Sequence, residues 1–290
     1  SVTDGKILSQ LKDDIEIVFH LSCYHGNQSS IANPIEDHEN NMFSSLKLFE
    51  RIKSFKNLRK VVYAAAGCAV AEKTFEETTP TEEDQPVSLF HDSPYSISKL
   101  VGEMYGNYYW ARHKFPFVKA RFQNVYGPGE ILGAGRWRGT EHTVWRNVVP
   151  SFIWKSLKGE SLPLENGGKA GRDFIYIDDI CRGLIACAEN GKPGEAYNLA
   201  SGLETTIRFL AQEINSITGN EAPLDILPAR DWDKSGRRKG SVIKSKQKLG
   251  FSSKVDLRSG LEATVLWTKN NRKIIERSIL NHKEKMDRYS

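Results

Sequence analysis

The sequence predicts an α/β fold in which a doubly wound parallel sheet is covered by helices on both faces. Short apolar runs of strand length alternate with longer segments whose apolar residues recur at helical spacing, which is typical of such a sheet. The chain has 290 residues, 39% of them hydrophobic and 27% charged, which supports a large core and excludes a disordered or fibrous protein. The longest apolar run, residues 61–71, has eleven residues, and a membrane-spanning helix needs about 20.

The elements of the first half follow from apolar runs and helix caps. They are a strand at residues 15–22, a helix at 35–55, a strand at 58–66, a helix at 93–115 and a strand at 117–126. Ser93 is the predicted N-cap of the second helix, and Pro94 lies in its first turn. Gly127 ends the last strand.

The second half continues the alternation after a long loop. The expected elements are a loop at 129–147, a helix at 149–158, a strand at 174–177, a helix ending at Glu189, a strand at 196–199, a helix ending at Thr218 and a final helix from 259 to about 285. Asp178 or Asp179 is the predicted N-cap of the helix that ends at Glu189. Thr205 or Thr206 is the predicted N-cap of the helix that ends at Thr218, and Gly219 terminates that helix.

Tyr95 and Lys99 form a candidate catalytic pair on the helix predicted at 93–115. A spacing of four residues places both side chains on one helix face. An ammonium beside a phenol lowers the pKa of the phenol, so such a tyrosine can take or give a proton while a cofactor carries a hydride. Chance alone produces a pair of this spacing in a chain with 10 tyrosines, so the pair by itself does not establish a site.

Further motifs follow this pair in a fixed order. They are Asn-Val-Tyr-Gly-Pro-Gly at 124–129, Gly-Arg-Asp-Phe-Ile-Tyr-Ile-Asp-Asp at 171–179, Tyr-Asn-Leu-Ala-Ser-Gly at 197–202 and Leu-Gly-Phe at 249–251. Together with Tyr95 and Lys99, this set resembles the extended short-chain dehydrogenase/reductase family, specifically its nucleotide-sugar epimerases and dehydratases. The resemblance spans nearly the whole chain. Among members of the family, the chain is most similar to epimerases of bacterial O-antigen and other surface-polysaccharide pathways.

The resemblance implies two domains. A Rossmann-type domain that binds NAD would comprise residues 1–128 and about 171–200. A smaller α/β lobe that binds the nucleotide sugar would comprise residues from about 129 to 170 and from 201 to 290.

The resemblance also implies site residues. Tyr95 matches the catalytic acid/base of the family, and Lys99 matches the lysine that also holds the nicotinamide ribose. The implied cofactor-binding residues are Leu21, Ser22, Cys23, Asn41, Ala64, Ala65, Tyr95 and Lys99. The implied substrate-binding residues are Asn124 and Arg172 at the diphosphate, with Arg230 as a second arginine.

The glycine-rich phosphate loop of the family is not found at the start of this sequence. The first expected strand matches a later strand of the family, so roughly 50 to 60 residues are expected to precede Ser1, because one βαβ unit takes about 30 residues. Gly129, Gly133 and Gly135 spell the glycine pattern, but no apolar helix follows them. Without the preceding segment weak NAD binding is expected, and the choice between NAD and NADP stays open.

The catalytic serine or threonine of the family is also absent. Its slot is occupied by Ala66, Gly67 and Cys68. The Cys68 thiol could replace the hydroxyl only as a weak hydrogen-bond donor, and a structural role for this cysteine is favoured. Ser93 and Ser96, beside Tyr95, are further candidates to supply the hydroxyl. Dehydratases and decarboxylases of the family carry acidic residues where this chain has Gly67, Cys68 and Ala69, so both reactions are disfavoured and epimerisation is left.

Three arginines, Arg136, Arg138 and Arg146, lie within eleven residues of the predicted loop. A guanidinium binds carboxylates and phosphates in a bidentate way. We hypothesise that one or more of them recognises an acidic or amide-bearing sugar. The alternative is a solvent-exposed loop without such a role.

The sequence therefore predicts an NAD-dependent epimerase that acts at C4 of a UDP-sugar through a transient ketone. The alternatives are a reductase or dehydrogenase of the same fold and a non-catalytic binding relative. A homodimer is expected, because the helices at 35–55 and 93–115 carry more apolar surface than one sheet face needs. The four cysteines and seven histidines show no metal-ligand spacing, so we expect no metal. The scattered cysteines favour a cytoplasmic protein. We also expect no nucleic-acid partner and, because the apolar runs are short, no membrane partner.

Overall fold

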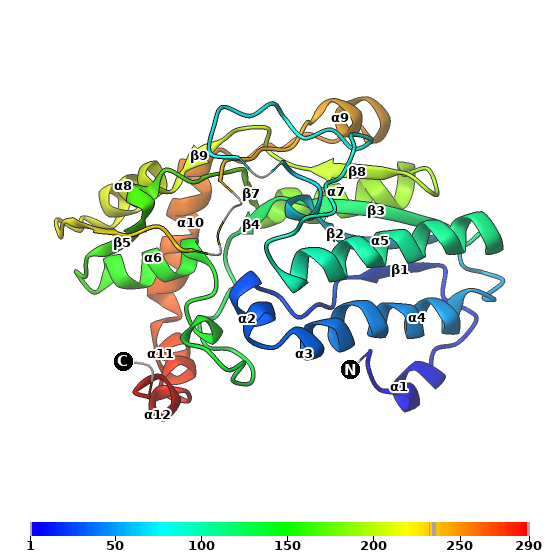
Figure 1. Cartoon of the computed structure of the whole chain (residues 1–290), viewed down its shortest axis with the longest axis horizontal. Helices are drawn as coiled ribbons and strands as arrows, with labels where there is room; N and C mark the ends of the chain where they lie inside the picture. Colours follow the sequence, from blue (N-terminus) through cyan, green and yellow to red (C-terminus); the bar gives the residue numbers. More distant parts are fainter. Residues whose placement is uncertain (1, 73, 232, 234–235, 289–290) are drawn as a thin grey trace.

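The structure is a computed structural model that describes all residues except 1, 73, 232, 234–235 and 289–290. Its centre is a sheet with the strand order β1-β2-β3-β8 (Figure 1). The strands are β1 (Ile17–His20), β2 (Lys60–Ala66), β3 (Phe117–Phe122) and β8 (Ala196–Leu199). Each neighbouring pair is parallel, which confirms the predicted fold class.

Helices cover both faces of this sheet. They are α4 (Ser44–Ile52) and α5 (Pro94–His113) on one face and α7 (Ile177–Asn190) on the other. Side chains of β2 alternate between the two faces, as the pleat of a strand requires. Val61 and Tyr63 pack with Phe49 of α4, whereas Val62 packs with Leu184 of α7. The sheet is therefore doubly wound.

Two glycines let α5 approach the sheet closely. A Cβ at Gly102 would collide with the Tyr63 hydroxyl, and a Cβ at Gly106 would collide with the Phe117 ring. Neither ring can move away, because both are fully packed in the core. This close packing fixes the helix that carries the Tyr–Lys pair against β2 and β3.

A second group of elements forms a smaller core beside the sheet (Figure 1). It contains α6 (Val148–Leu157), α8 (Ile207–Thr218), α10 (Leu257–Asn270), β4 (Asn124–Tyr126), β5 (Leu162–Glu165), β7 (Phe174–Tyr176) and β10 (Leu224–Leu227). β5 pairs with β10 and β4 pairs with β7, both in parallel. Phe152, Leu164 and Leu210 are among the buried side chains of this core.

The remaining elements are short. They are α1 (Gly5–Ser9), α2 (Asn27–Ala32), α3 (Pro34–His38), β6 (Gly171–Arg172), β9 (Thr205–Thr206), α9 (Ile243–Leu249), α11 (Arg272–Leu280), α12 (Lys283–Met286), a π-helical turn (Glu39–Phe43) and 3₁₀ turns at Gly67–Ala69, Glu141–Thr143 and Asn166–Gly168. The sequence did not predict α2, α9, β5 or β10. The helix predicted at 35–55 is found as α3, the π-helical turn and α4 in succession.

Several local predictions are confirmed by side-chain contacts. The Ser93 Oγ accepts the Ser96 N–H at the start of α5, and the Thr206 Oγ1 accepts the Phe209 N–H at the start of α8. Gly219 ends α8 in the left-handed conformation that favours glycine.

The prediction of one strand at 117–126 was wrong, because the chain divides at Gln123 into β3 and β4. β3 stays in the central sheet, whereas β4 leaves it and pairs with β7. The Asn124 N–H donates to the Asp173 carbonyl at 2.9 Å. The change of sheet depends on a partner strand from a distant part of the sequence, which a local apolar run does not reveal.

The predicted caps of α7, Asp178 or Asp179, were also wrong, because the helix begins at Ile177 with Tyr176 at the N-cap. Asp179 has a different role. Its buried Oδ2 accepts the N–H groups of Lys254 and Val255, both at 3.0 Å. The carboxylate thereby ties α7 to the segment before α10.

The final helix predicted from 259 to about 285 is three helices. It begins earlier, at Leu257, because Asp256 is the N-cap and its Oδ1 accepts the Ser259 N–H. α10 ends before Asn271, and α11 and α12 follow it.

Candidate active site

The carboxyl ends of the central strands open into a cavity of about 990 Å³, at the place where parallel α/β sheets bind ligands. Most of the predicted site residues meet there. Those in the lining are Leu21, Cys23, Ala64, Ala65, Ala66, Cys68, Tyr95, Lys99, Asn124, Arg138, Arg172 and Arg230. Ser22, Asn41, Gly67 and Arg136 lie outside the lining.

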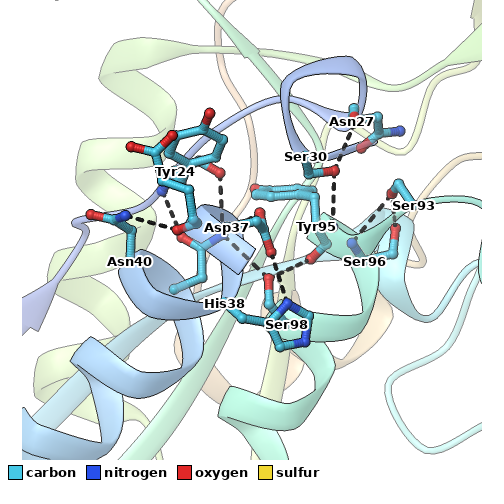
Figure 2. Close-up of polar contacts among 12 residues, drawn as sticks. Tyr24, Asn27, Ser30, Asp37, His38, Asn40, Ser93, Tyr95, Ser96 and Ser98 are labelled. Atoms are coloured by element: carbon cyan, nitrogen blue, oxygen red, sulfur yellow. Dashed lines mark hydrogen bonds and ion pairs between the residues drawn. The ribbon is translucent and has the colours of Figure 1, made fainter. Parts of the chain in front are cut away.

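The backbone of Tyr95 is held from two sides (Figure 2). Its N–H donates to Ser30 Oγ, and its carbonyl accepts from Ser98 Oγ, each at 3.1 Å. Ser30 belongs to α2, and its own hydroxyl donates to the Asn27 carbonyl at 2.7 Å. The unpredicted helix α2 therefore fixes the place from which the Tyr95 side chain enters the cavity.

The Lys99 ammonium is buried, with 3% of the residue exposed. Its Nζ donates to the Ala64 carbonyl at 2.7 Å and lies 5.0 Å from the centre of the Tyr63 ring. An ammonium has three N–H groups, and the Ala64 carbonyl is the one hydrogen-bond acceptor that the described residues offer it. The remaining N–H groups can therefore bind hydroxyls of a ligand in the cavity.

Burial governs the protonation of the Tyr–Lys pair. It raises the pKa of Tyr95 well above its usual value, and the nearby thiols of Cys23 and Cys68 add to this effect. Burial also lowers the pKa of Lys99. The lowered tyrosine pKa that the sequence predicts is not seen here, because loss of hydration outweighs the attraction of the ammonium. Tyr95 is thus a neutral phenol in this structure.

Asn41 holds the segment after β1 in place. Its Oδ1 accepts the Tyr24 N–H at 2.6 Å, and its Nδ2 donates to the Tyr24 carbonyl at 3.1 Å. The same Nδ2 lies 2.8 Å from Asp37 Oδ1 and 3.2 Å from Ser98 Oγ. The amide is therefore occupied within the protein and positions residues that line the cavity, including His25.

No serine hydroxyl of α5 replaces the absent serine or threonine among the described residues. Ser93 and Ser96 are buried, bonded to each other at 3.2 Å, and outside the cavity lining. Cys68 does line the cavity, with its Sγ 3.9 Å from Ser96 Oγ. The thiol therefore packs beside Tyr95 at the wall of the cavity.

His25 is a site residue that the sequence analysis missed. It lies in the loop between β1 and α2, and its ring packs against the Tyr95 ring with 5.7 Å between the centres. Burial, followed by the charge of Arg146, lowers the pKa of His25 to about 4. Its imidazole is therefore neutral at neutral pH, and burial and the nearby positive charges oppose its protonation. Its position shortly after a strand end was the one signal in the sequence.

A pair of arginines occupies another part of the cavity. Arg172 Nη1 donates to the Gly171 carbonyl at 2.8 Å and to the Gly236 carbonyl. Arg238, which the sequence analysis missed, is buried beside it, and its Nη1 finds no hydrogen-bond partner among the described residues. Burial, followed by the Arg238 charge, lowers the pKa of Arg172 to about 9. Arg172 Nη2 also lies 3.9 Å from Asp233 Oδ2. Two guanidinium groups beside one carboxylate leave an excess of positive charge, which suits an anion.

Arg230 also lines the cavity, but its guanidinium is already engaged in an ion pair with Glu165. Arg172 also has a carboxylate nearby, Asp233, but Arg238 adds a second guanidinium whose Nη1 is unpaired in the described part of the chain. Arg172 and Arg238 therefore suit an anion better than Arg230 does.

Comparison with known proteins places this geometry in a family. Residues 1–200 match the family described as NAD dependent epimerase/dehydratase. The chain belongs to that family. The match confirms the resemblance inferred from the motifs and the expected dependence on NAD.

The relatives include enzymes of more than one reaction type. The crystal structure of the Bordetella bronchiseptica enzyme WbmF with NAD+ and UDP is 55% identical, with all of this chain and 82% of that chain aligned and a TM-score of 0.88. A putative UDP-glucose 4-epimerase of Methanocaldococcus jannaschii is 29% identical over 89% of this chain and 78% of that protein. Human dTDP-D-glucose 4,6-dehydratase is 25% identical over 89% of this chain and 70% of that protein.

The residues present fit the nicotinamide and ribose end of NAD. Three alanines, Ala64, Ala65 and Ala66, leave space at the end of β2, and the unmatched donors of Lys99 suit ribose hydroxyls. Across the part of the chain that the structure describes, no three His, Cys, Asp or Glu residues are grouped to hold a metal ion. No described helix is long and apolar enough to cross a membrane.

Proposed function

We propose that the protein is an NAD-dependent epimerase that inverts C4 of a UDP-sugar. The observation that carries this proposal is that Tyr95, Lys99 and Arg172 open into one cavity. The first two residues suit proton transfer at a sugar hydroxyl, and the third suits a diphosphate. Epimerases of UDP-glucose from Methanocaldococcus jannaschii and Thermotoga maritima are among the relatives.

In this mechanism Tyr95 takes the proton of the C4 hydroxyl as that carbon becomes a ketone. NAD, when bound, supplies the hydride acceptor and donor. Lys99 lies one helical turn away and favours the phenolate form that the step needs. The ketone then turns within the cavity and presents its other face, and Tyr95 returns the proton to oxygen as the alcohol forms again.

We assign the diphosphate to Arg172 and Arg238, with Asn124 and Arg230 as neighbours in the lining. The burial of Arg172 and Arg238 favours this assignment, because an anion would neutralise two charges that are withdrawn from water. Direct contacts of Leu21, Cys23, Ala64 and Ala65 with NAD are proposed from their places in the same lining.

We propose the domain division at residues 1–128 with about 171–200, and at about 129–170 with 201–290. The first part contains the central sheet and the helices that cover it. Most members of the smaller core belong to the second part.

A second candidate function, inversion at a carbon next to the ketone, is favoured by Cys68. It lies in the stretch where the resemblance implies acidic residues in dehydratases, and its thiol lines the cavity beside Tyr95. A thiolate can take a proton from a carbon that a neighbouring ketone acidifies. The neutral His25 ring lies against Tyr95, and Tyr95 is the partner that returns a proton in this alternative.

Deuterium incorporation separates the two candidates. In D₂O with NAD and a UDP-sugar, epimerisation by hydride return gives a C4 epimer without deuterium on carbon, since the hydride never exchanges with solvent. Proton removal by Cys68 places deuterium on the carbon next to the ketone. NMR spectroscopy of the product identifies the position.

The matched variants for this experiment are Cys68→Ala and Cys187→Ala, the latter at a buried cysteine of α7 that does not line the cavity. C4 epimerisation that survives in Cys68→Ala with no carbon-bound deuterium supports the first candidate. Exchange that is lost only in Cys68→Ala supports the second. If no UDP-sugar gives an epimer or incorporates deuterium, both candidates are wrong, and the reductase and the non-catalytic binding relative are the functions left.

We propose that the chain forms a homodimer through α4 and α5. Met104 and Tyr108, four residues apart on α5, are 52% and 55% exposed, and Phe43 just before α4 is 48% exposed. Such an apolar helix face is typical of a two-fold interface. Met104→Glu is expected to convert a dimer to a monomer in sedimentation velocity, whereas Leu266→Glu, at an exposed position on α10, leaves the dimer intact. A monomeric parent chain would refute the interface.

A further inference from the structure

Arg138 is held close to the candidate reaction centre. Its Nη1 donates to the His25 carbonyl at 2.8 Å, and the His25 ring packs against Tyr95. Its guanidinium carbon lies 4.5 Å from the centre of the Tyr24 ring. The Arg138 N–H donates to Thr143 Oγ1 at 2.9 Å, so both ends of the residue are anchored.

Arg146 lies in the same part of the cavity without an anchor of its own. It is half-buried in the lining, and its guanidinium makes no hydrogen bond or ion pair with the residues that the structure describes. Its charge acts on both Arg138 and His25, and it contributes to the lowered pKa of each. Two guanidinium groups thus face one region beside Tyr95.

The surrounding acids do not balance this charge. Glu130 is the carboxyl group that interacts with Arg146, and burial raises its pKa, while Asn147 Nδ2 donates to its carboxylate. The neighbouring Arg136 differs, because it is exposed and paired with Glu36 outside the cavity. Two partly buried guanidinium groups beside the single carboxyl group of Glu130 leave an excess of positive charge, which is costly, and a ligand anion would remove that cost.

Apart from Arg230, which is paired with Glu165, the arginines that line the cavity form two pairs, Arg172 with Arg238 and Arg138 with Arg146. A neutral nucleotide sugar carries one anionic group, its diphosphate, and would occupy one pair. We propose that the sugar ring of the substrate carries a carboxylate, as in a uronic acid, and that Arg146 with Arg138 binds it beside Tyr95. The proposal rests on the assignment of a nucleotide sugar as substrate.

Binding affinities measured with NAD present test the carboxylate directly. The probes are UDP, and two matched pairs that differ only at C6: UDP-glucuronate with UDP-glucose, and UDP-galacturonate with UDP-galactose. In calorimetry at least one uronate is expected to bind about tenfold or more tightly than its neutral partner, as a hydrogen-bonded ion pair contributes at this level. Arg146→Gln is expected to bring the ratio close to one and to leave the UDP affinity unchanged.

Arg136→Gln is the matched control, since it removes an arginine of the same loop that lies outside the cavity. It is expected to keep the preference for the uronate. Equal affinities within both pairs, or a preference that survives Arg146→Gln, would overturn the proposal. UDP-N-acetylglucosamine, which carries an amide, is added as a further probe, and tighter binding of it than of either uronate would also overturn the proposal. Absence of UDP binding itself would instead count against the nucleotide-sugar function.

Discussion

Replacement of Tyr95 with phenylalanine is expected to remove epimerisation and to leave the fold intact. The phenol is the one group in the proposed mechanism that exchanges a proton with the sugar oxygen, and loss of such a group lowers a rate by about 10²- to 10⁴-fold. Its backbone contacts to Ser30 and Ser98 do not involve the hydroxyl. The thermal unfolding midpoint is therefore expected to change little while kcat for C4 epimerisation falls.

Tyr108→Phe is the control for this variant. Tyr108 lies on the same helix, and 55% of the residue is exposed on the surface rather than in the cavity. It is expected to epimerise UDP-sugars at the parent rate. Normal turnover by the Tyr95→Phe protein would show that Tyr95 is not the acid/base, and weight would move to Cys68 and His25.

Replacement of Glu103 with leucine is expected to lower the free energy of unfolding by about 3 to 5 kcal/mol, the range for breaking a buried ion pair by removing one partner. Glu103 on α5 holds Arg121 on β3 through two hydrogen bonds of 3.0 and 2.8 Å, and both side chains are buried. Arg121 also donates to the Glu83 carbonyl at 2.7 Å. The variant leaves the guanidinium in the core without its carboxylate.

Urea denaturation followed by circular dichroism measures this loss. The control is Glu16→Gln, which breaks the exposed ion pair with Arg59 and is expected to cost no more than about 1 kcal/mol. The double variant Glu103→Leu with Arg121→Met is expected to recover much of the stability, because no charge then stays buried. A Glu103→Leu protein as stable as the Glu16→Gln protein would contradict the argument. Because α5 carries Tyr95 and Lys99, we also expect weaker epimerase activity.

The local sequence determined the central architecture. The apolar runs of β2 and β8 were recognisable because a strand buried between two layers of helices needs apolar side chains on both faces. The caps Ser93 and Thr206 were also recognisable, because a helix start is satisfied by a side chain within three residues. The four-residue spacing of Tyr95 and Lys99 placed both on one face of α5 and near the cavity.

The tertiary structure decided what depends on distant neighbours. The division of the strand at Gln123 required β7 as a partner, and the role of Asp179 required backbone groups some 75 residues away. Burial reversed the predicted shift in the pKa of Tyr95, and no local pattern reports how much water a fold removes from a phenol.

The same limit applies to the residues that line the cavity. His25 and Arg238 carry no motif, and they became site residues only when the loop after β1 and the segment after β10 met at the carboxyl ends of the sheet. The sequence showed three arginines in one loop, but only the packing separated Arg136, which is paired outside the cavity, from Arg138 and Arg146 within it. The sequence alone determines apolar runs, helix caps and the spacing of neighbouring residues. Burial and charge balance are determined by contacts between segments that lie far apart along the chain.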